Sequence, residues 1–175
     1  MSHGYEGLCT LVPVADGRES PLREHLHSLP VGARSPMTRV PGTHFARWTV
    51  LRLEGTDGRP HPGLPPLLLF SAEFDGPLEE YARRLCRRLG ADAHAIWSHC
   101  AGYPGDDPAE LAAWLLRHRV RPGYSVVAYP DTTVEQVRAA IGLRERLGDF
   151  LIRAERLEPE ALQRAWLQRF RARDR

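Results

Sequence analysis

Two apolar segments of this sequence carry polar side chains that could do chemistry. Residues 43–48 read THFARW and residues 67–76 read LLLFSAEFDG, and both have the composition of β-strands. A polar group inside such a strand needs a partner or a purpose. An arginine near a carboxylate in a semi-enclosed site can orient a substrate or accept a proton, so Arg47 and Glu73 are the first catalytic candidates.

Strand alternation predicts which of these side chains share a face. The even positions of 67–74 are all apolar and are expected to lie under helices. The odd positions form a mixed face with those of the preceding strand, which places Arg47, Thr49, Ser71 and Glu73 together as the wall of a pocket. A structural ion pair between Arg47 and Glu73, with no role in catalysis, is the alternative.

The outer strands are expected to contribute Thr10, Ser125 and Tyr129 to the same face. An aromatic segment, 95–105, is predicted to be a short strand or a buried loop, and it supplies one further residue. The predicted substrate-binding residues are Thr49, Ser71, Trp97 and Tyr129.

Three of the eight histidines are placed where an imidazole could act. His44, His99 and His118 are each predicted as a general base or an axial haem ligand, and a purely structural role is the alternative for each. His44 falls on the parity opposite to Arg47. The chain has no HxxxH, CxxCH or HExxH spacing, so no zinc site and no other specific metal is predicted.

Composition excludes several classes of function. All 24 basic residues are arginine, and the absence of lysine excludes Schiff-base catalysis and a Walker-type phosphate loop. The same bias, with no asparagine, indicates a GC-rich bacterial genome. The net charge of +2 and the acidic residues near the arginine-rich end disfavour nucleic acid as a partner. Three cysteines without CxxC spacing are expected to be reduced.

No apolar run approaches the roughly 20 residues that span a bilayer, and the first residues lack signal-peptide order. We therefore expect a cytoplasmic protein without a membrane partner.

The order of expected elements is β-α-β-β-α, an inserted helix, then β-α, which predicts an α+β fold. This is the split βαβ, ferredoxin-like arrangement, as domain 1–155 with a helical extension at 156–175. The expected strands are 8–14, 44–53, 67–74 and 124–129, and the expected helices are 20–29, 78–89, 107–119, 134–151 and one from 159. Asp75 is expected to serve the turn and cap of the helix at 78–89, and Asp107 to cap the helix at 107–119. The last helix is expected to carry an apolar stripe of Leu162, Trp166 and Phe170.

Four segments together resemble a bacterial family of the dimeric α+β barrel superfamily. They are 43–48, 68–76, 96–104 and 124–130, which read THFARW, LLFSAEFDG, IWSHCAGYP and YSVVAYP. The resemblance implies a homodimer in which two sheets enclose a pocket. Members of the superfamily include haem-dependent dye-decolorising peroxidases and small antibiotic-biosynthesis monooxygenases that need no cofactor, so haem and no cofactor are left open equally.

The expected function is that of an oxidoreductase, monooxygenase-like or peroxidase-like, acting on a small and partly apolar molecule, with a role in secondary metabolism. The alternative is a non-catalytic module that binds a small molecule or another protein.

Overall fold

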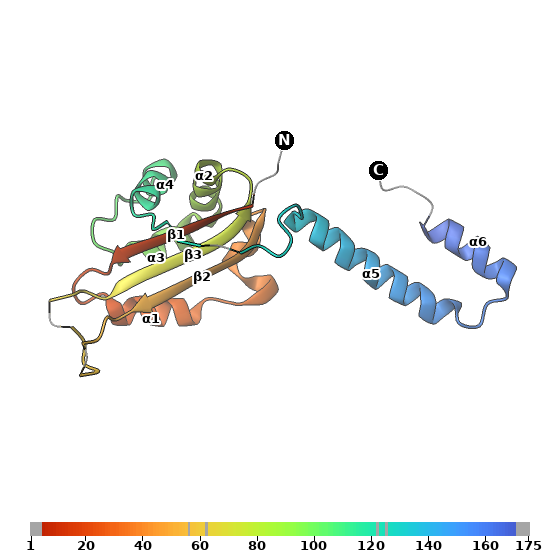
Figure 1. The fold of residues 1–175 in the computed structure, drawn as a ribbon, viewed down its shortest axis with the longest axis horizontal. Helices are drawn as coiled ribbons and strands as arrows, with labels where there is room; N and C mark the ends of the chain where they lie inside the picture. The colour runs from red at the N-terminus through yellow and green to blue at the C-terminus, as the bar shows by residue number, and fades with distance from the viewer. Residues whose placement is uncertain (1–4, 56, 62, 122, 125, 171–175) are drawn as a thin grey trace. The chain divides into compact units, whose positions relative to one another are not determined.

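The computed structural model describes residues 5–170 except positions 56, 62, 122 and 125 (Figure 1). The chain divides into two compact units, residues 1–134 and residues 135–175. We call the first the sheet unit and the second the helical unit. The sequence analysis set the boundary between residues 155 and 156. The division in the structure instead groups the expected helix at 134–151 with the C-terminal extension and not with the sheet.

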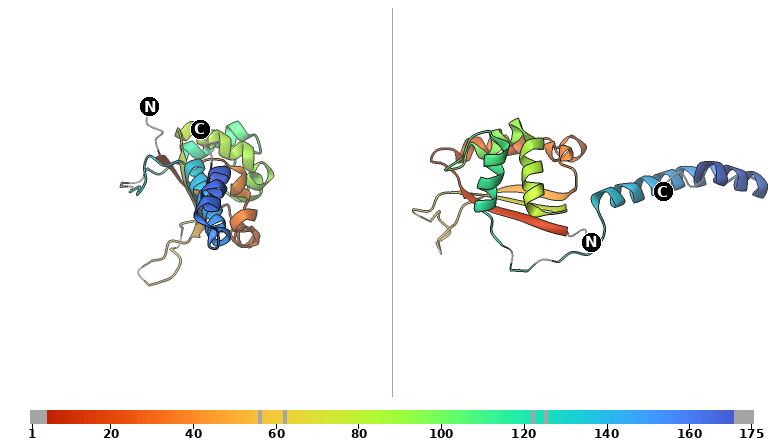
Figure 2. Two further views of the ribbon diagram at one scale, coloured as in Figure 1. Left: turned by 90° about the vertical axis from the view of Figure 1, so that its right-hand side faces the viewer. Right: turned by 90° about the horizontal axis from the view of Figure 1, so that it is seen from above.

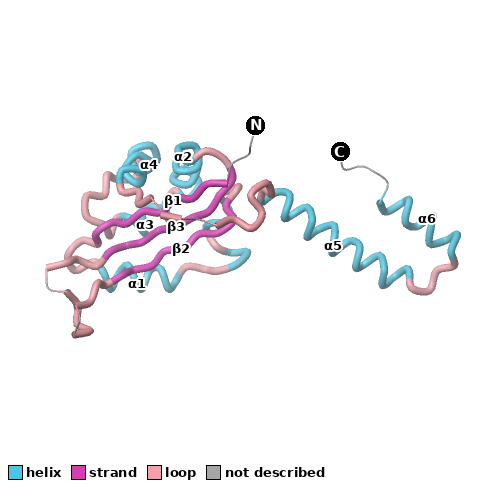
Figure 3. The backbone as a smooth tube through the Cα atoms, in the orientation of Figure 1, coloured by secondary structure: helices cyan, strands magenta, loops and turns pink. Residues whose placement is uncertain are grey.

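The sheet unit is built on three antiparallel strands, β1 (Tyr5–Pro13), β2 (Thr43–Leu51) and β3 (Leu67–Asp75), in the order β1-β3-β2 (Figure 3). The three strands lie within two residues of their predicted positions at every boundary but the start of β1. Central strand β3 pairs Ala72 with Leu8 on one side and with Ala46 on the other. The α+β class is therefore confirmed.

Four helices of the sheet unit cover one face of this sheet (Figure 2). The aromatic segment 95–105 was predicted to be a short strand or a buried loop. Its residues 95–97 instead end a short helix, and residues 98–105 form turns and irregular structure. At the start of α4 (Pro108–Arg117), the Asp107 carboxylate accepts hydrogen bonds from the N–H groups of Ala109 and Glu110, which is the cap that the sequence predicts. The helices are α1 (Glu19–Ser28), α2 (Leu78–Leu89), α3 (Ala91–Trp97) and α4 (Pro108–Arg117), and 3-10 turns η1 (Gly32–Arg34) and η2 (Pro36–Arg39) precede β2.

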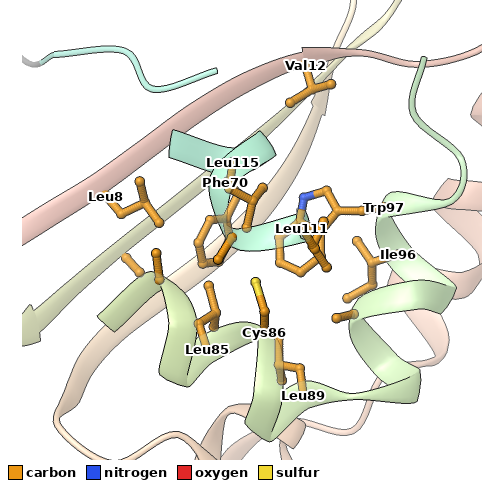
Figure 4. Packing of buried hydrophobic residues seen from close by; sticks show 14 of the residues in the cluster. Leu8, Val12, Phe70, Leu85, Cys86, Leu89, Ile96, Trp97, Leu111 and Leu115 are labelled. Carbon is orange, nitrogen blue, oxygen red and sulfur yellow. The ribbon is translucent and has the colours of Figure 1, made fainter. Parts of the chain in front are cut away.

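The core lies between the sheet and these helices (Figure 4). Phe70 meets the Trp97 ring edge-on at 5.5 Å between centroids, and Phe74 stacks on Tyr81 at 3.7 Å. The even positions of β3, namely Leu68, Phe70, Ala72 and Phe74, are all fully buried, as alternation predicted. One face of the sheet is therefore assigned to the core.

The fourth strand expected at 124–129 is not observed among the described residues of that segment. Instead the chain touches the outer edge of β1 only briefly, where Leu11 N–H donates to His118 and Val120 N–H donates to Cys9. The sequence continues with Pro122 and Gly123, and a proline has no N–H to donate to a ladder. The four-stranded ferredoxin-like sheet is thus not confirmed.

The helical unit contains α5 (Val134–Ala154, whose first residue belongs to the sheet unit) and α6 (Pro159–Phe170). Phe150 of α5 contacts the rings of Trp166 and Phe170 at centroid distances of 5.5 and 5.4 Å. Part of the apolar stripe predicted for the last helix therefore packs on α5. In the described part of the chain, no helix is long and apolar enough to cross a membrane.

Replacing Leu85 of α2 with alanine should destabilise the sheet unit by roughly 2–5 kcal/mol, because the removed methyl groups leave a cavity in a core that cannot collapse completely. Leu85 is fully buried, whereas Leu64 is 50% exposed and provides a matched control. Denaturant unfolding of both variants measures the difference. A Leu85→Ala variant as stable as Leu64→Ala would contradict this description of the core.

Candidate functional site

The face of the sheet that helices α1–α4 leave uncovered carries the predicted mixed set of side chains. We call it the open face. Its rows follow the strand register: Cys9, Ser71 and Arg47 lie in one row, and Gly7, Glu73 and Phe45 lie in the next. A further row of Leu11, Leu69 and Thr49 is largely apolar. The structure therefore brings Arg47, Thr49, Ser71 and Glu73 to one surface, as alternation predicted.

Arg47 is held by its neighbours on this face. Its Nε donates to the Ser71 hydroxyl at 3.2 Å, and its guanidinium carbon lies 5.8 Å from the centre of the Phe45 ring. Its two terminal nitrogens make no hydrogen bond with the described residues. The anchored guanidinium therefore keeps its bidentate end available for an acceptor.

Glu73 does not form the predicted ion pair with Arg47. The register sets Ser71 opposite Arg47 and places Glu73 two residues further along β3, opposite Phe45. Its Oε2 atom is buried and has no hydrogen-bond partner among the described residues. A buried carboxylate oxygen without a donor is costly, which marks Oε2 of Glu73 as an unsatisfied atom of the open face.

Gly7 makes room for this carboxylate. A β-carbon at position 7 would lie 3.0 Å from Glu73 Oε2, which is tighter than most packing contacts, so the carboxylate would have to shift slightly. Tyr5 stands two residues before Gly7 on the same face. Burial raises the pKa of its hydroxyl to about 12, together with hydrogen bonding to the Glu73 carboxylate and the charge of that carboxylate. Burial raises the pKa of the nearby Cys9 thiol, an effect that Arg47 opposes and Glu73 reinforces.

His44 reaches the open face through an irregularity in β2. The register shifts between Thr43 and Phe45, so the simple parity that assigned His44 to the other face does not hold. Its Nε2 donates to Asp75 Oδ1 at 2.7 Å, and its ring lies 5.7 Å from that of Tyr5. The other oxygen of Asp75 accepts a hydrogen bond from the N–H of Val134 at 2.9 Å. The result is a histidine–carboxylate pair beside the Glu73 row.

The other two candidate histidines lie elsewhere. His118 ends α4, where its Nδ1 bonds to the carbonyl of Trp114 at 2.9 Å. His99 lies in the turn after α3, and burial, with the charges of Arg18 and His25, lowers its pKa. Its Nδ1 is buried and lacks a partner among the described residues. Neither histidine is brought to Arg47 and Glu73.

Two predicted substrate-binding residues also fall outside the open face. Trp97 is fully buried between the sheet and the helices, because α3 points it into the core. Tyr129 is 76% exposed in an irregular segment, because the strand that was to orient it does not form. Thr10, predicted for the mixed face, pairs with Phe70 and is buried on the helix side. Ser125 lies outside the described residues.

Sequence reasoning missed Tyr5, Gly7 and Cys9, which share the odd parity of β1. The expected start of that strand at residue 8 hid the first two. Asp75 was interpreted as a cap for the following helix, yet α2 has no side-chain cap and Asp75 bonds to His44 instead.

The open face combines hydrogen-bond acceptors with a cation and a histidine, next to an apolar row. Such a surface can bind a molecule that offers both a donor and an acceptor, and Glu73 or His44 could exchange a proton with it. Within the described ranges, no group of three or more His, Cys, Asp or Glu side chains could hold a metal ion.

Comparisons of the chain with protein-family models, with curated proteins and with solved structures gave no match.

Replacing Glu73 with glutamine should lower the pKa of Tyr5 from about 12, since an uncharged amide no longer opposes the phenolate. Burial would keep it above its ordinary value of 10. Phenolate absorbance against pH, with and without an added Tyr5→Phe change, isolates this residue. An unchanged titration of Tyr5 would rule out the influence of the carboxylate.

The same raised pKa predicts the pH dependence of stability. Tyr5 favours the folded state fully below pH 10, and this contribution disappears as the pH rises from 10 through about 12. Wild-type protein should therefore lose more stability over that range than Tyr5→Phe.

Proposed function

We propose that the open face binds a small, partly apolar molecule that carries a hydrogen-bond donor and an acidic or carbonyl oxygen. The buried, unpartnered Oε2 of Glu73 is the observation that carries the proposal. The ligand's donor would satisfy that oxygen, and its acceptor would meet the terminal nitrogens of Arg47. Diagonal neighbours on adjacent strands lie about 7–8 Å apart, which suits a single aromatic or short aliphatic molecule between them.

A second copy of the chain would close the site, as in a dimeric α+β barrel. Phe45 is 50% exposed on the open face, and the row of Leu11 and Leu69 is only half-buried. Covering these side chains with a second sheet would remove apolar surface from water and enclose the ligand. The short contact of 118–120 with the edge of β1 is in keeping with a ferredoxin-like sheet whose last strand is reduced.

We further propose that the bound molecule is oxidised. Glu73 would take a proton from an activated CH₂ group, Arg47 would stabilise the resulting anion, and the anion would reduce dioxygen. The CH₂ group becomes a carbonyl, and the second oxygen atom leaves as water. His44, held by Asp75, would return protons to the oxygen species.

Haem chemistry is the other form of this oxidoreductase proposal. His44 is the one candidate ligand on the open face among the three predicted, and its Nδ1 is the nitrogen that would bind iron, since Nε2 bonds to Asp75. His99 and His118 lie elsewhere and do not fit the same site. Bound haem would supply redox chemistry, and Arg47 and Glu73 would then position the substrate.

A binding test uses 4-hydroxybenzoate and salicylate, which carry a carboxylate and a hydroxyl, with benzoate as the probe that lacks the donor. In the wild type we expect saturable shifts of the backbone NMR signals of β2 and β3, with benzoate weaker than the hydroxylated probes. Arg47→Ala and Glu73→Gln should each weaken binding about tenfold or more, because each removes a charged hydrogen-bonding partner. Arg59→Ala and Glu54→Gln, at exposed loop positions, are the matched controls.

Equal binding by the variants and their controls, or signal changes confined to other elements, would contradict this placement of the site.

Catalysis is tested by hemin titration and by product analysis under dioxygen, with 4-hydroxyphenylpyruvate as the probe because it carries a carboxylate, a hydroxyl and an activated CH₂ group. A Soret band that His44→Ala removes would select the haem form. Oxidised product without haem, lost in Glu73→Gln, would select the cofactor-free form. Saturable binding with no product under either condition would instead support the non-catalytic binding module.

A further inference from the structure

The helical unit exposes far more apolar surface than a stable small unit should. Among its described residues, 135–170, only Phe150 and Ala154 are buried. Units of fewer than about 40 residues seldom hold a core without metal, disulfide or association. Nine large apolar side chains remain exposed here: Val137, Ile141, Leu143, Leu151, Ile152, Leu157, Leu162, Trp166 and Leu167.

One side of α5 has the pattern of a helix–helix seam. Val137, Ile141, Glu145, Gly148 and Ile152 recur at spacings of four, four, three and four residues, with Arg144 beside Glu145. This side points away from Phe150, the residue that packs on α6. The seam is therefore not used within the hairpin of α5 and α6.

We propose that this seam pairs with the same seam of a second copy, with the two α5 helices antiparallel about a twofold axis near residues 144 and 145. Val137 then faces Ile152 of the partner subunit, and Ile141 faces Gly148 of the partner subunit. At the centre, Arg144 faces Glu145 of the partner subunit, twice by symmetry. Within one copy neither Arg144 nor Glu145 has an ion-pair partner among the described residues, so the pairing supplies the missing opposite charges.

Gly148 gives an independent reason for the same pairing. Glycine in a helix interior lowers helix stability relative to alanine, so its presence needs a cause. A β-carbon at Gly148 would meet no atom within 4 Å, so the packing of its own chain does not require glycine there. The side chain of Ile141 from the partner helix fits that open position.

The charge of the helical unit favours this occupant over a strongly charged partner. Residues 135–170 contain seven arginines and six acidic residues, interspersed along both helices. Nucleic acids and anionic lipid surfaces select clustered positive charge. A nearly neutral, mixed surface with an apolar seam suits a copy of itself.

A disulfide cross-link tests this pairing without interference from any contact between sheets. Cys9 lies on the open face, so it is replaced by serine in every variant of this test, whereas Cys86 and Cys100 are buried. In a full-length Val137→Cys, Ile152→Cys variant of this kind, the two introduced cysteines of one copy are about 22 Å apart along α5 and cannot join. Oxidation should therefore produce a covalent dimer, visible on a non-reducing gel and lost on reduction. Val137→Cys alone and Ile152→Cys alone are the controls, and they should give little covalent dimer because the antiparallel arrangement separates identical positions.

Charge exchange in this double-cysteine background tests the register. Glu145→Arg or Arg144→Glu alone should lower the initial rate of cross-linking about tenfold, since like charges then meet at the axis. The combined Arg144→Glu, Glu145→Arg exchange should restore it, and circular dichroism would verify that every variant is helical. Two outcomes would overturn the proposal, whatever else then covers the α5–α6 hairpin. One is cross-linking no faster than in the controls that carry Val137→Cys or Ile152→Cys alone. The other is single charge exchanges that leave the rate unchanged. Arg47→Ala should leave the cross-linking unchanged, so failure of the open-face site is recognised separately.

Discussion

The burial of alternate side chains on β3 is the constraint on which the rest of the sheet unit depends. Leu68, Phe70, Ala72 and Phe74 leave no tolerance for a shift in register, because a slip of one residue would expose all of them and bury Ser71 and Glu73. The central position of β3 then transmits this choice to both neighbours. The polar composition of the open face is thus a consequence of the packing on the opposite face.

The same constraint explains why the charges of the open face do not simply neutralise one another. The register gives Arg47 a hydroxyl partner, Ser71, and leaves Glu73 between Gly7 and Phe45, neither of which offers a side-chain donor. The Tyr5 hydroxyl interacts with the Glu73 carboxylate, but the Oε2 atom has no hydrogen-bond partner among the described residues. A carboxylate oxygen kept buried without a donor is a cost to folding, and such costs are typical of sites that a ligand completes. The pKa values of Tyr5 and Cys9 are raised for the same local reasons, namely burial and the negative charge of Glu73.

The two units differ in how many large apolar side chains they bury. The sheet unit buries large side chains such as Trp97, Tyr81 and Phe70 between two layers. In the described part of the helical unit, the aromatic rings of Phe150, Trp166 and Phe170 pack together, and nine large apolar side chains are exposed. The association proposed for the helical unit therefore rests on its small core, whereas the association proposed for the sheet unit rests on an uncovered face.

Sequence alone determined the three strands, the helical spacings, the Asp107 cap and the common face of Arg47, Thr49, Ser71 and Glu73, because each depends on local periodicity or on a residue's own chemistry. Tertiary structure decided the rest. Three findings depend on which residues lie opposite one another, and spacing along the chain does not encode that. They are the irregularity in β2 that brings His44 to Asp75, the absence of a strand among the described residues of 124–129, and the burial of Trp97. Odd and even positions predict the face of a side chain only where a strand is regular. The pattern therefore assigned Arg47 to the correct face and His44 to the wrong one.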